Sequence, residues 1–242
     1  YDPGTGNWTW MKGASTVNQI GTYGTLGTAD AANTPGARYG AVSWTDSSGA
    51  FWLFGGHSGG GFPDYLNDLW KYDPATGNWT WMKGSSTANQ SGTYGTQGTA
   101  DPANTPGARS DAVSWTDSSG GLWLFGGGGT DGGGGSGLLN DLWKYDPATG
   151  NWTWMKGAST VNQSGTSGTQ ETPDVANTPG ARRSAVSWTD SDGALWLFGG
   201  YGNDGTGISG RLNDLWKYDP ASGNWTWMKG ASGPQTGTYS TQ

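Results

Sequence analysis

The sequence predicts an all-β protein made of repeated, four-stranded antiparallel sheets, on three observations. First, one pattern recurs along the 242 residues: Tyr-Asp-Pro begins at Tyr1, Tyr72, Tyr145 and Tyr218, at spacings of 71, 73 and 73 residues. Second, each unit holds four short runs of aromatic and β-branched residues separated by turn residues, and no run has a helical period. Third, the 17 Trp residues carry too much apolar surface for a disordered chain.

The first complete unit shows the four strands, which we name A to D. They are predicted at residues 41–45, 51–54, 69–72 and 79–82. Strands A and B are joined by Asp-Ser-Ser-Gly and strands C and D by Asp-Pro-Ala-Thr-Gly, and both segments carry residues typical of tight turns. A Gly-Gly pair follows strand B and permits backbone angles closed to other residues.

Apolar residues on both faces of these strands indicate how the sheets pack. In strand B, Trp52 and Phe54 share one face while Leu53 lies on the other. A sheet that is apolar on both sides needs cover on both sides, and copies of itself can provide it. Radial stacking of four-stranded antiparallel sheets is a β-propeller. We therefore expect three complete blades plus one N-terminal orphan strand at residues 8–11.

Each unit also resembles the kelch repeat, in which a Gly-Gly pair follows an apolar strand and precedes a Tyr and then a Trp. The matching residues are Gly55, Gly56, Tyr72 and Trp79 in the first unit, Gly126, Gly127, Tyr145 and Trp152 in the second, and Gly199, Gly200, Tyr218 and Trp225 in the third. The resemblance covers nearly the whole chain. It implies propeller blades of kelch type and a role as an interaction module, although fold alone does not establish function.

The units are longer than the roughly 50 residues usual for kelch repeats. The excess lies in three polar D–A segments of 19 residues each, at 14–32, 85–103 and 158–176. Their constant length and similar amino-acid sequences favour an ordered loop that packs on its own blade. The predicted divisions are 1–13 (last strand of a preceding or partner blade), 14–84 (blade 1 with its D–A loop), 85–157 (blade 2), 158–230 (blade 3) and 231–242 (divergent C-terminal tail).

Three blades and one extra strand do not close a propeller, which usually needs about 4–8 blades. Two chains would bring two strands more than six blades require. The chain is therefore expected to be either a segment of a longer kelch-repeat protein or one subunit of a multichain ring or stack. Because the sequence starts at Tyr1 without Met or a signal peptide, a processed product or a fragment is expected. In either case the end blades expose Trp-rich faces, which copies of the chain or further blades would cover.

Composition excludes several function classes. With no Cys and one His, the chain has no disulfide framework, thiol nucleophile or multi-His metal site, and we expect no cofactor and no metal. A net charge of −7 without a Lys/Arg block argues against nucleic-acid binding, and no apolar run is long enough for membrane insertion. Kelch propellers of the copper radical oxidase type need Cys, Tyr and several His ligands, so that chemistry is excluded. The acidic, Cys-free composition favours a secreted, extracellular bacterial protein.

Any ligand site is predicted on one side of the disc. Antiparallel strands place the B–C loops, at 57–66, 128–139 and 201–212, on the same side as the D–A loops. Loops on a rigid scaffold favour binding residues. The candidates are His57, Asp64, Tyr65, Asp131, Tyr201, Asn203, Asp204 and Arg211 in B–C loops, and Tyr23 and Tyr94 in D–A loops. The counterparts of His57 in the other units are Gly128 and Tyr201, and we expect this lone His at the surface.

Other recurring residues indicate structure. The Arg of Pro-Gly-Ala-Arg and the Asp of Asn-Asp-Leu occur in every unit, as Arg38, Arg109 and Arg182 and as Asp68, Asp141 and Asp214. Three copies favour a structural ion pair or hydrogen-bond anchor, because a single active site needs only one. All Trp residues are repeat positions and are expected between blades. The leading functional hypothesis is a non-catalytic scaffold that binds protein or itself, and the alternative is a lectin-like glycan-binding propeller.

Overall fold

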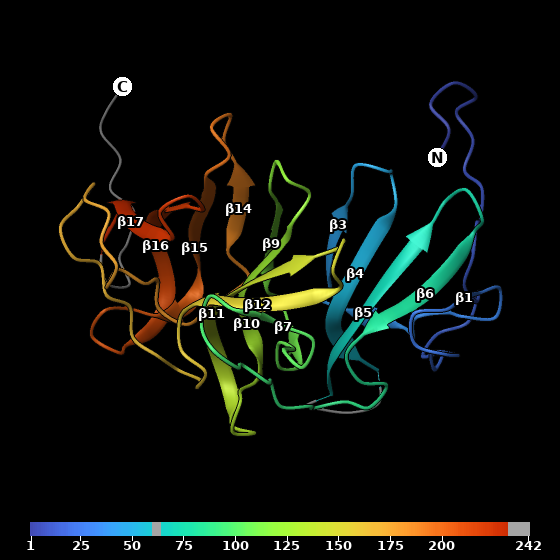
Figure 1. Ribbon diagram of the computed structural model, residues 1–242, viewed down its shortest axis with the longest axis horizontal. Coiled ribbons are helices and arrows are strands. Elements are labelled where there is room, and N and C mark those ends of the chain that lie inside the picture. Colours follow the sequence, from blue (N-terminus) through green and yellow to red (C-terminus); the bar gives the residue numbers. More distant parts are fainter. Residues whose placement is uncertain (60–63, 232–242) are drawn as a thin grey trace.

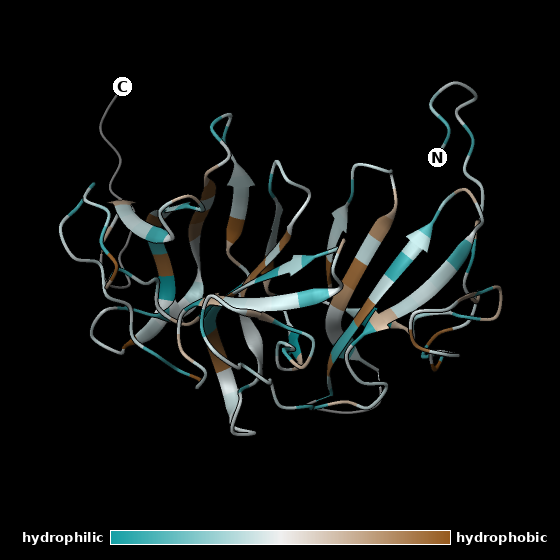
Figure 2. Cartoon of the chain, in the orientation of Figure 1, coloured by the Kyte–Doolittle hydropathy of each residue, from teal (hydrophilic) through white to brown (hydrophobic). Residues whose placement is uncertain are grey.

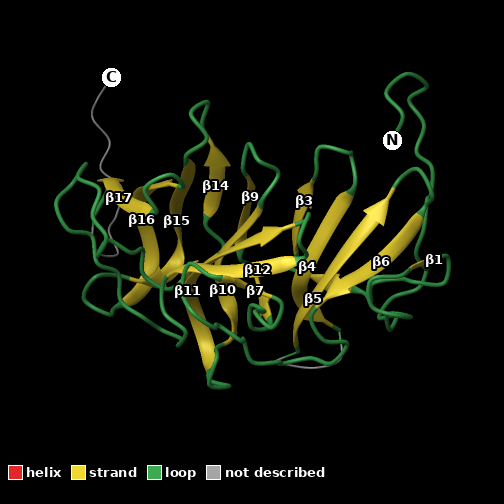
Figure 3. Ribbon diagram, viewed as in Figure 1, coloured by secondary structure: helices red, strands yellow, loops and turns green. Residues whose placement is uncertain are grey.

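The computed structural model describes residues 1–59 and 64–231. The regular secondary structure of these residues consists of β-strands, without α-helices (Figures 1 and 3). The strands form three antiparallel sheets that follow one another along the long axis of the molecule. The predicted all-β fold with propeller blades is thus confirmed. Among the described residues there is no helix that could span a membrane. The predicted C-terminal tail lies, from residue 232 on, outside the described residues.

Each sheet follows the order that the repeat predicts. In blade 1 the order is β1-β6-β5-β4-β2, with β3 also paired to β4, so that β2 and β3 are two halves of strand A. Strand B is β4, strand C is β5 and strand D is β6. The strands of blade 1 are β1 (Ala29–Asp30), β2 (Arg38–Tyr39), β3 (Val42–Thr45), β4 (Phe51–Ser58), β5 (Tyr65–Asp73) and β6 (Asn78–Lys83).

Blade 2 repeats this arrangement, and blade 3 repeats it without a strand from its D–A segment. Blade 2 comprises β7 (Ala100–Asp101), β8 (Arg109–Ser110), β9 (Val113–Thr116), β10 (Leu122–Thr130), β11 (Ser136–Asp146) and β12 (Asn151–Lys156). Blade 3 comprises β13 (Arg182–Arg183), β14 (Val186–Thr189), β15 (Leu195–Asn203), β16 (Ser209–Asp219) and β17 (Asn224–Lys229). The short strands β1 and β7 belong to D–A segments and pair with strand D of the blade that follows them. These segments therefore pack on their own blades.

Strand A breaks at a residue in the left-handed region. This residue is Gly40 in blade 1, Asp111 in blade 2 and Ser184 in blade 3, with φ of 64°, 55° and 55°. The break turns the backbone toward the neighbouring blade. The amide of Asp111 donates to the carbonyl of Gly40 at 2.8 Å, and the amide of Ser184 donates to that of Asp111 at 2.8 Å. A line of backbone hydrogen bonds thus links the three blades.

Strands B and C are longer than predicted, and the predicted B–C loops are wrong. The Gly-Gly pair bends strand B without ending it: Gly55 and Gly56 have φ of 65° and 99°, and the register with β5 shifts there. Pairing resumes beyond this β-bulge. The connections in blades 2 and 3 shrink to residues 131–135 and 204–208. In blade 1, residues 60–63 of the predicted loop lie outside the described part.

The predicted orphan strand at residues 8–11 does not form a β-strand, because the described residues place no strand C beside it to pair with. Trp8 is 83% exposed. The segment still lies against blade 1 as strand D of a preceding blade would. Lys12 Nζ donates to the carbonyls of Gly77 at 3.1 Å and Ala31 at 2.9 Å. Lys83 makes the equivalent bonds one blade on, at 3.2 and 2.7 Å.

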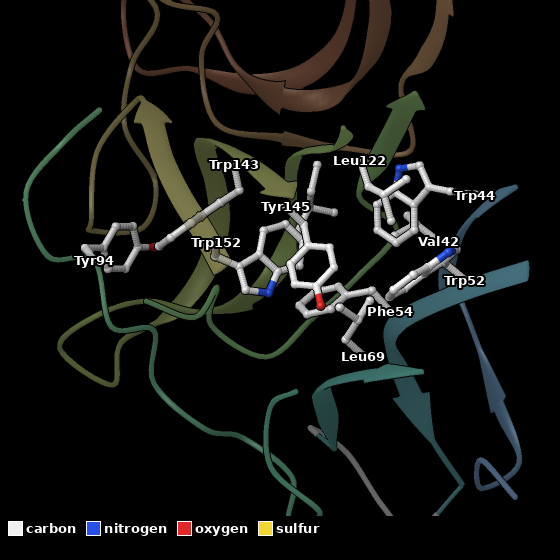
Figure 4. Close-up of a cluster of buried hydrophobic side chains, with 11 residues drawn as sticks. Val42, Trp44, Trp52, Phe54, Leu69, Tyr94, Leu122, Trp143, Tyr145 and Trp152 are labelled. Carbon is white, nitrogen blue, oxygen red and sulfur yellow. The ribbon is translucent and has the colours of Figure 1, made fainter. Parts of the chain in front are cut away.

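Two apolar clusters form the core, and each lies between neighbouring blades. Figure 2 shows apolar segments concentrated in the sheets, and Figure 4 shows most of the first cluster. We call the contributing sides the front face of one blade and the back face of the next. The front faces of blades 1 and 2 are Val42, Trp44, Trp52, Phe54 and Leu69, and Val113, Trp115, Trp123, Phe125 and Leu142. The back faces of blades 2 and 3 are Leu122, Leu124, Trp143, Tyr145 and Trp152, and Leu195, Leu197, Trp216, Tyr218 and Trp225.

A single Asp organises each A–B turn. In blade 2, Asp117 Oδ1 accepts the amides of Ser119 and Gly121 at 2.9 and 2.8 Å. Its Oδ2 accepts Trp123 Nε1 at 2.7 Å and Lys144 Nζ at 2.8 Å. Asp46 and Asp190 hold the other two A–B turns in the same way. The carboxylate therefore ties the turn to strands B and C.

Stability is expected to fall in acid as these carboxylates take up protons. Burial acts to raise the pKa of Asp117, but hydrogen bonds from Lys144, Ser119, Trp123 and the Gly121 amide outweigh it and lower the pKa to about 2, from an ordinary 3.8. The stabilisation is thus complete above the unfolded value and is lost as the pH falls toward 2. Asp117→Asn should unfold with a flatter pH dependence between pH 5 and 2, measured by urea titration. Parallel curves for the variant and the wild type would contradict this assignment.

Candidate functional site

A buried ion pair anchors each blade beside the D–A segment. Arg109, from β8, donates to both carboxylate oxygens of Asp141, from β11, at 2.6 and 2.7 Å. The two side chains are 1% and 0% exposed. Arg38 with Asp68 and Arg182 with Asp214 repeat the pair in the other blades. Bidentate Arg–carboxylate geometry fixes direction as well as distance, so the pair locks strand A to strand C.

In two blades a tyrosine completes this anchor. The hydroxyl of Tyr94 donates to Asp141 Oδ2 at 2.7 Å. Its ring centroid lies 4.9 Å from that of Trp143 and 5.1 Å from that of Trp154. Burial and the Asp141 carboxylate raise the pKa of Tyr94, so the phenol keeps its proton and donates. Tyr23 does the same in blade 1, with Asp68 at 2.7 Å.

The tyrosine is a packing residue, so the prediction that Tyr23 and Tyr94 face a ligand is wrong. Tyr94 is 8% exposed, and Figure 4 shows its ring directed toward Trp143. Its function is to hold the D–A segment on the blade. The sequence carried a signal for this contact, since both tyrosines follow Gln-x-Gly-Thr in the same position of the repeat.

Blade 3 lacks this tyrosine. Ser167 stands at the position, and a narrow cavity remains beside it. The cavity is lined by Ser167, Arg182, Asp214, Trp216 and Trp227, with Gly165, Gly180, Asn203, Asp204 and Gly205. Asp214 still accepts Arg182 at 2.6 and 2.7 Å and Trp216 Nε1 at 2.7 Å. One of the three anchors therefore has an open place where the others hold a ring.

The polar candidates at the B–C hairpins mostly turn inward. Asp131, Asn203 and Asp204 are 4–5% exposed. Asp131 Oδ1 accepts the amides of Gly133 and Gly135 at 2.9 and 2.7 Å, and Asp204 holds the equivalent turn. Asp131 and Asp204 thus satisfy backbone groups of their own hairpins, whereas Asn203 donates to the carbonyl of Asn162 in the D–A segment at 2.8 Å. Their placement on a ligand-facing surface was a wrong prediction.

The remaining candidates lie on or beside strands. His57, predicted at the surface, is 5% exposed on β4 because its ring stacks on Tyr39 at 5.0 Å and meets Tyr65 at 5.4 Å. Asp64 accepts the Ser58 amide at 3.0 Å through its carbonyl. Tyr201 and Arg211 are exposed and lie opposite each other on β15 and β16. The structure thus gathers no single loop-face site from these ten residues.

No metal centre is apparent in the described residues, where no three His, Asp or Glu side chains gather as ligands. On the front face of blade 3, apolar side chains that are buried in the other two blades are exposed. Val186, Trp188 and Phe198 are 60%, 43% and 43% exposed. Their counterparts in blades 1 and 2 are at most 8% exposed. Within residues 1–59 and 64–231, no blade covers this inter-blade surface of blade 3.

The back face of blade 1 is open in the same sense. Phe51, Leu53, Tyr72 and Trp79 line a groove of about 350 Å³, together with Met11. Met11 is the repeat counterpart of Met82, which packs on the first core cluster. The N-terminal segment thus covers one margin of the groove and leaves the rest open. Blades 1 and 3 therefore present complementary inter-blade faces.

Comparison with known proteins supports the fold alone. No protein-family model matches the chain, and no curated protein sequence matches it. A solved structure, that of YjhT, a kelch-type β-propeller protein, matches at 18% identity with a TM-score of 0.51. The match covers 80% of this chain and 52% of YjhT, so the chain spans about half of that protein's length. The chain therefore has a β-propeller type of fold.

Proposed function

We propose that this protein is a non-catalytic, extracellular repeat scaffold that associates with a second copy of itself through its two open blade faces. The exposed front face of blade 3 carries the proposal. Trp188 is 43% exposed, whereas its equivalents Trp44 and Trp115 are 4% and 3% exposed. Exposed apolar patches of this kind mark interaction surfaces. The extracellular location is proposed from the acidic, Cys-free composition.

A second copy fits because the same interface already forms twice inside the chain. Trp44 Nε1 donates to the carbonyl of Trp123 at 3.0 Å, and Trp115 Nε1 to that of Trp196 at 3.0 Å. By the repeat, Trp188 donates to Trp52 of a second copy. The ring centroids of Trp52 and Tyr145, and those of Trp123 and Tyr218, lie 5.5 Å apart across the two internal interfaces. The equivalent pair between copies is Trp196 with Tyr72 of the second copy.

Two divergent positions also meet in this arrangement. Within the chain, the Arg183 side chain packs 3.7 Å from where a Cβ on Gly128 would lie. The counterparts of Arg183 and Gly128 at the open ends are Tyr39 and Tyr201. These are 62% and 45% exposed. Docking of the ends brings the two tyrosines together and buries both.

The N-terminal segment competes with this docking. On blade 1, Lys12 Nζ donates to the carbonyls of Ala31 and Gly77. In the docked pair, Lys229 on β17 of the second copy would donate to these same two carbonyls. A closed pair of chains would carry six blades, which is within the range of about 4–8 blades for propellers. In such a pair both N-terminal segments would be displaced. Deletion of residues 1–13 is therefore expected to tighten self-association, with a dissociation constant lower by about tenfold.

Cysteine cross-linking tests the head-to-tail register, because the natural chain has no Cys. Within the chain, Ser114 Oγ donates to the carbonyl of Ser43 at 3.3 Å, and Ser187 Oγ to that of Ser114 at 3.3 Å. Ser43→Cys in one copy and Ser187→Cys in another should therefore cross-link when mixed. The matched control is the double variant Ser43→Cys/Ser114→Cys, which carries the same pair inside one chain.

Sedimentation equilibrium measures the association itself. Phe198→Lys should weaken it by at least about tenfold, because a charge enters the front face. Ile208→Lys is the matched control, since Ile208 is equally apolar and 61% exposed on the B–C hairpin. A monomer at all concentrations, even after deletion of residues 1–13, would refute self-association. Association without a 43–187 cross-link would refute only the register.

A lectin-like function has less support. The tyrosines expected to stack on a sugar, Tyr23 and Tyr94, donate to buried carboxylates instead. Among the candidates, Tyr201 and Arg211 remain exposed, beside Arg183 in an open groove of blade 3. That groove lies at the open face of blade 3, so self-association would cover it.

A further inference from the structure

We infer that Asn18 is a preformed clamp that takes the main chain of Arg211 from a second copy of the chain. In the associated pair, the Asn18 amide donates to the Arg211 carbonyl, and Asn18 Oδ1 accepts the Arg211 amide. The inference rests on the proposed self-association and deepens it, because it names the residue that fixes the register of the two copies. Two filled copies of the same clamp inside the chain show what it holds.

The filled clamps join each D–A segment to strand C of the preceding blade. The amide of Asn89 donates to the carbonyl of Tyr65 at 2.7 Å, and Asn89 Oδ1 accepts the Tyr65 amide at 3.0 Å. Asn162 makes both bonds with Leu138, at 2.7 and 2.9 Å. One Asn thus satisfies two backbone groups of the neighbouring blade, and it does so whichever side chain strand C carries there.

Strand C needs this clamp because it extends past strand D. In blade 1, β5 pairs with β6 only from Leu69 on, so that no residue of strand D pairs with Tyr65. In blade 3, β16 pairs with β17 only from Leu215 on, which leaves the outer edge of Arg211 open within the described residues. An open strand edge is a template for another chain. Blade 3 therefore offers the strand that a clamp takes.

Asn18 is the clamp that no strand fills. It occupies the same repeat position as Asn89 and Asn162 and shares their left-handed conformation, with φ of 56° against 59° and 61°. Among the described residues, no hydrogen bond reaches the Asn18 amide or its Oδ1. Asn enters this region more readily than most residues, but the conformation still costs free energy. Blade 1 thus keeps a costly geometry whose two hydrogen bonds it does not itself supply.

Gln19 holds this geometry before any docking. Its side-chain amide donates to the carbonyl of Val17 at 3.0 Å, and its own carbonyl accepts the Ala37 amide at 2.8 Å. Gln90 makes the same two bonds in blade 2, at 3.0 and 2.9 Å. Because the open and the filled clamps are held alike, docking requires no rearrangement of the D–A segment. Such preorganisation lowers the cost of association.

The tail that follows blade 3 has no equivalent Asn. An Asn follows each of the first three Met-Lys-Gly motifs at the same spacing, which gives Asn18, Asn89 and Asn162. After the last motif this position is Gln235, and the rest of the tail contains no Asn. A second copy offers Asn18 at this place, because its blade 1 follows blade 3 in the proposed ring.

Sedimentation equilibrium of the full chain tests the clamp through two matched variants. Asn18→Gly keeps the left-handed conformation but removes Oδ1, so it should weaken self-association by about tenfold and leave urea unfolding of the monomer unchanged. Asn89→Gly removes the same atom from a filled clamp, so it should lower the urea midpoint and leave the dissociation constant unchanged. Asn18→Asp retains an acceptor oxygen and should associate at least as tightly as the wild type.

Hydrogen exchange of the Arg211 amide reports the contact directly. In the monomer this amide should exchange faster than its counterparts at Tyr65 and Leu138, and association should protect it. At equal degrees of association, Asn18→Gly should leave it unprotected. Association with an unprotected Arg211 amide, or unchanged affinity in Asn18→Gly, would refute the clamp and leave self-association standing. A chain that stays monomeric even without residues 1–13 would refute both.

Discussion

Replacement of Asp141 by Ala is expected to lower the free energy of unfolding by about 3–5 kcal/mol, the range for loss of one partner of a buried ion pair. Asp141 is 0% exposed and accepts hydrogen bonds from Arg109, Tyr94 and Trp143. Its removal leaves the buried Arg109 guanidinium without a counter-charge and two neutral donors with no acceptor. Strand A, strand C and the D–A segment all lose their common anchor.

Urea unfolding of Asp141→Ala, with tryptophan fluorescence as the signal, measures this loss. Asp214→Ala is the internal comparison, because blade 3 has the ion pair and the Trp216 bond but no tyrosine. Its effect should be smaller by about 1 kcal/mol, the value of one hydrogen bond. Asp101→Ala, on the exposed short strand β7, should cost less than about 1 kcal/mol. Equal effects at Asp141 and Asp101 would contradict the anchor.

Gly157→Ala is expected to destabilise blade 2 by about 2–5 kcal/mol, from backbone strain and overpacking together. Gly157 directly follows strand D, with φ of 81° in the left-handed region. An added Cβ would collide with the carbonyl of Asn140 on strand C. The next residue, Ala158, donates its amide to the Asn140 side chain at 3.1 Å. The added methyl group therefore separates strands C and D where the chain leaves the sheet.

The matched control is Gly133→Ala, at the B–C hairpin of the same blade. There a Cβ meets only Asp131 Oδ1, at an ordinary 3.6 Å. Its free energy of unfolding should change by less than about 1 kcal/mol. Chemical denaturation of both variants gives the comparison. A neutral Gly157→Ala would mean that the end of strand D is free to move away from Asn140.

The repeat predicted the blades because spacing and alternation are local properties of the sequence. Trp52 and Phe54 on one face of a strand, with Leu53 on the other, already required cover on both sides. The recurring Arg and Asp likewise indicated a structural pair, and each Arg lies bidentate on its Asp. These features depend on residues that every unit repeats.

What the sequence did not predict depends on distant partners. The Gly-Gly pair suggested the end of strand B, but β5 and β11 supply pairing partners beyond the bulge. Tyr94 was predicted to contact a ligand, but its hydroxyl donates to Asp141, which lies 47 residues away in the sequence. The strand predicted at residues 8–11 does not form for the opposite reason, since the described part of the chain offers it no strand C to pair with. The cavity at Ser167 becomes visible only when the three anchors are superposed by the repeat.

The near identity of the two inter-blade surfaces also bears on how the chain refolds. The front of blade 1 matches the back of blade 3 as well as that of blade 2, with Trp216 and Tyr218 in the places of Trp143 and Tyr145. A refolding chain can therefore dock the first sheet on the third and expel the middle one, a misassembly typical of repeat proteins. Such a misfolded species would have a native-like interface between blades 1 and 3 and would therefore unfold slowly. Blade 2 would stay undocked and open to proteolysis.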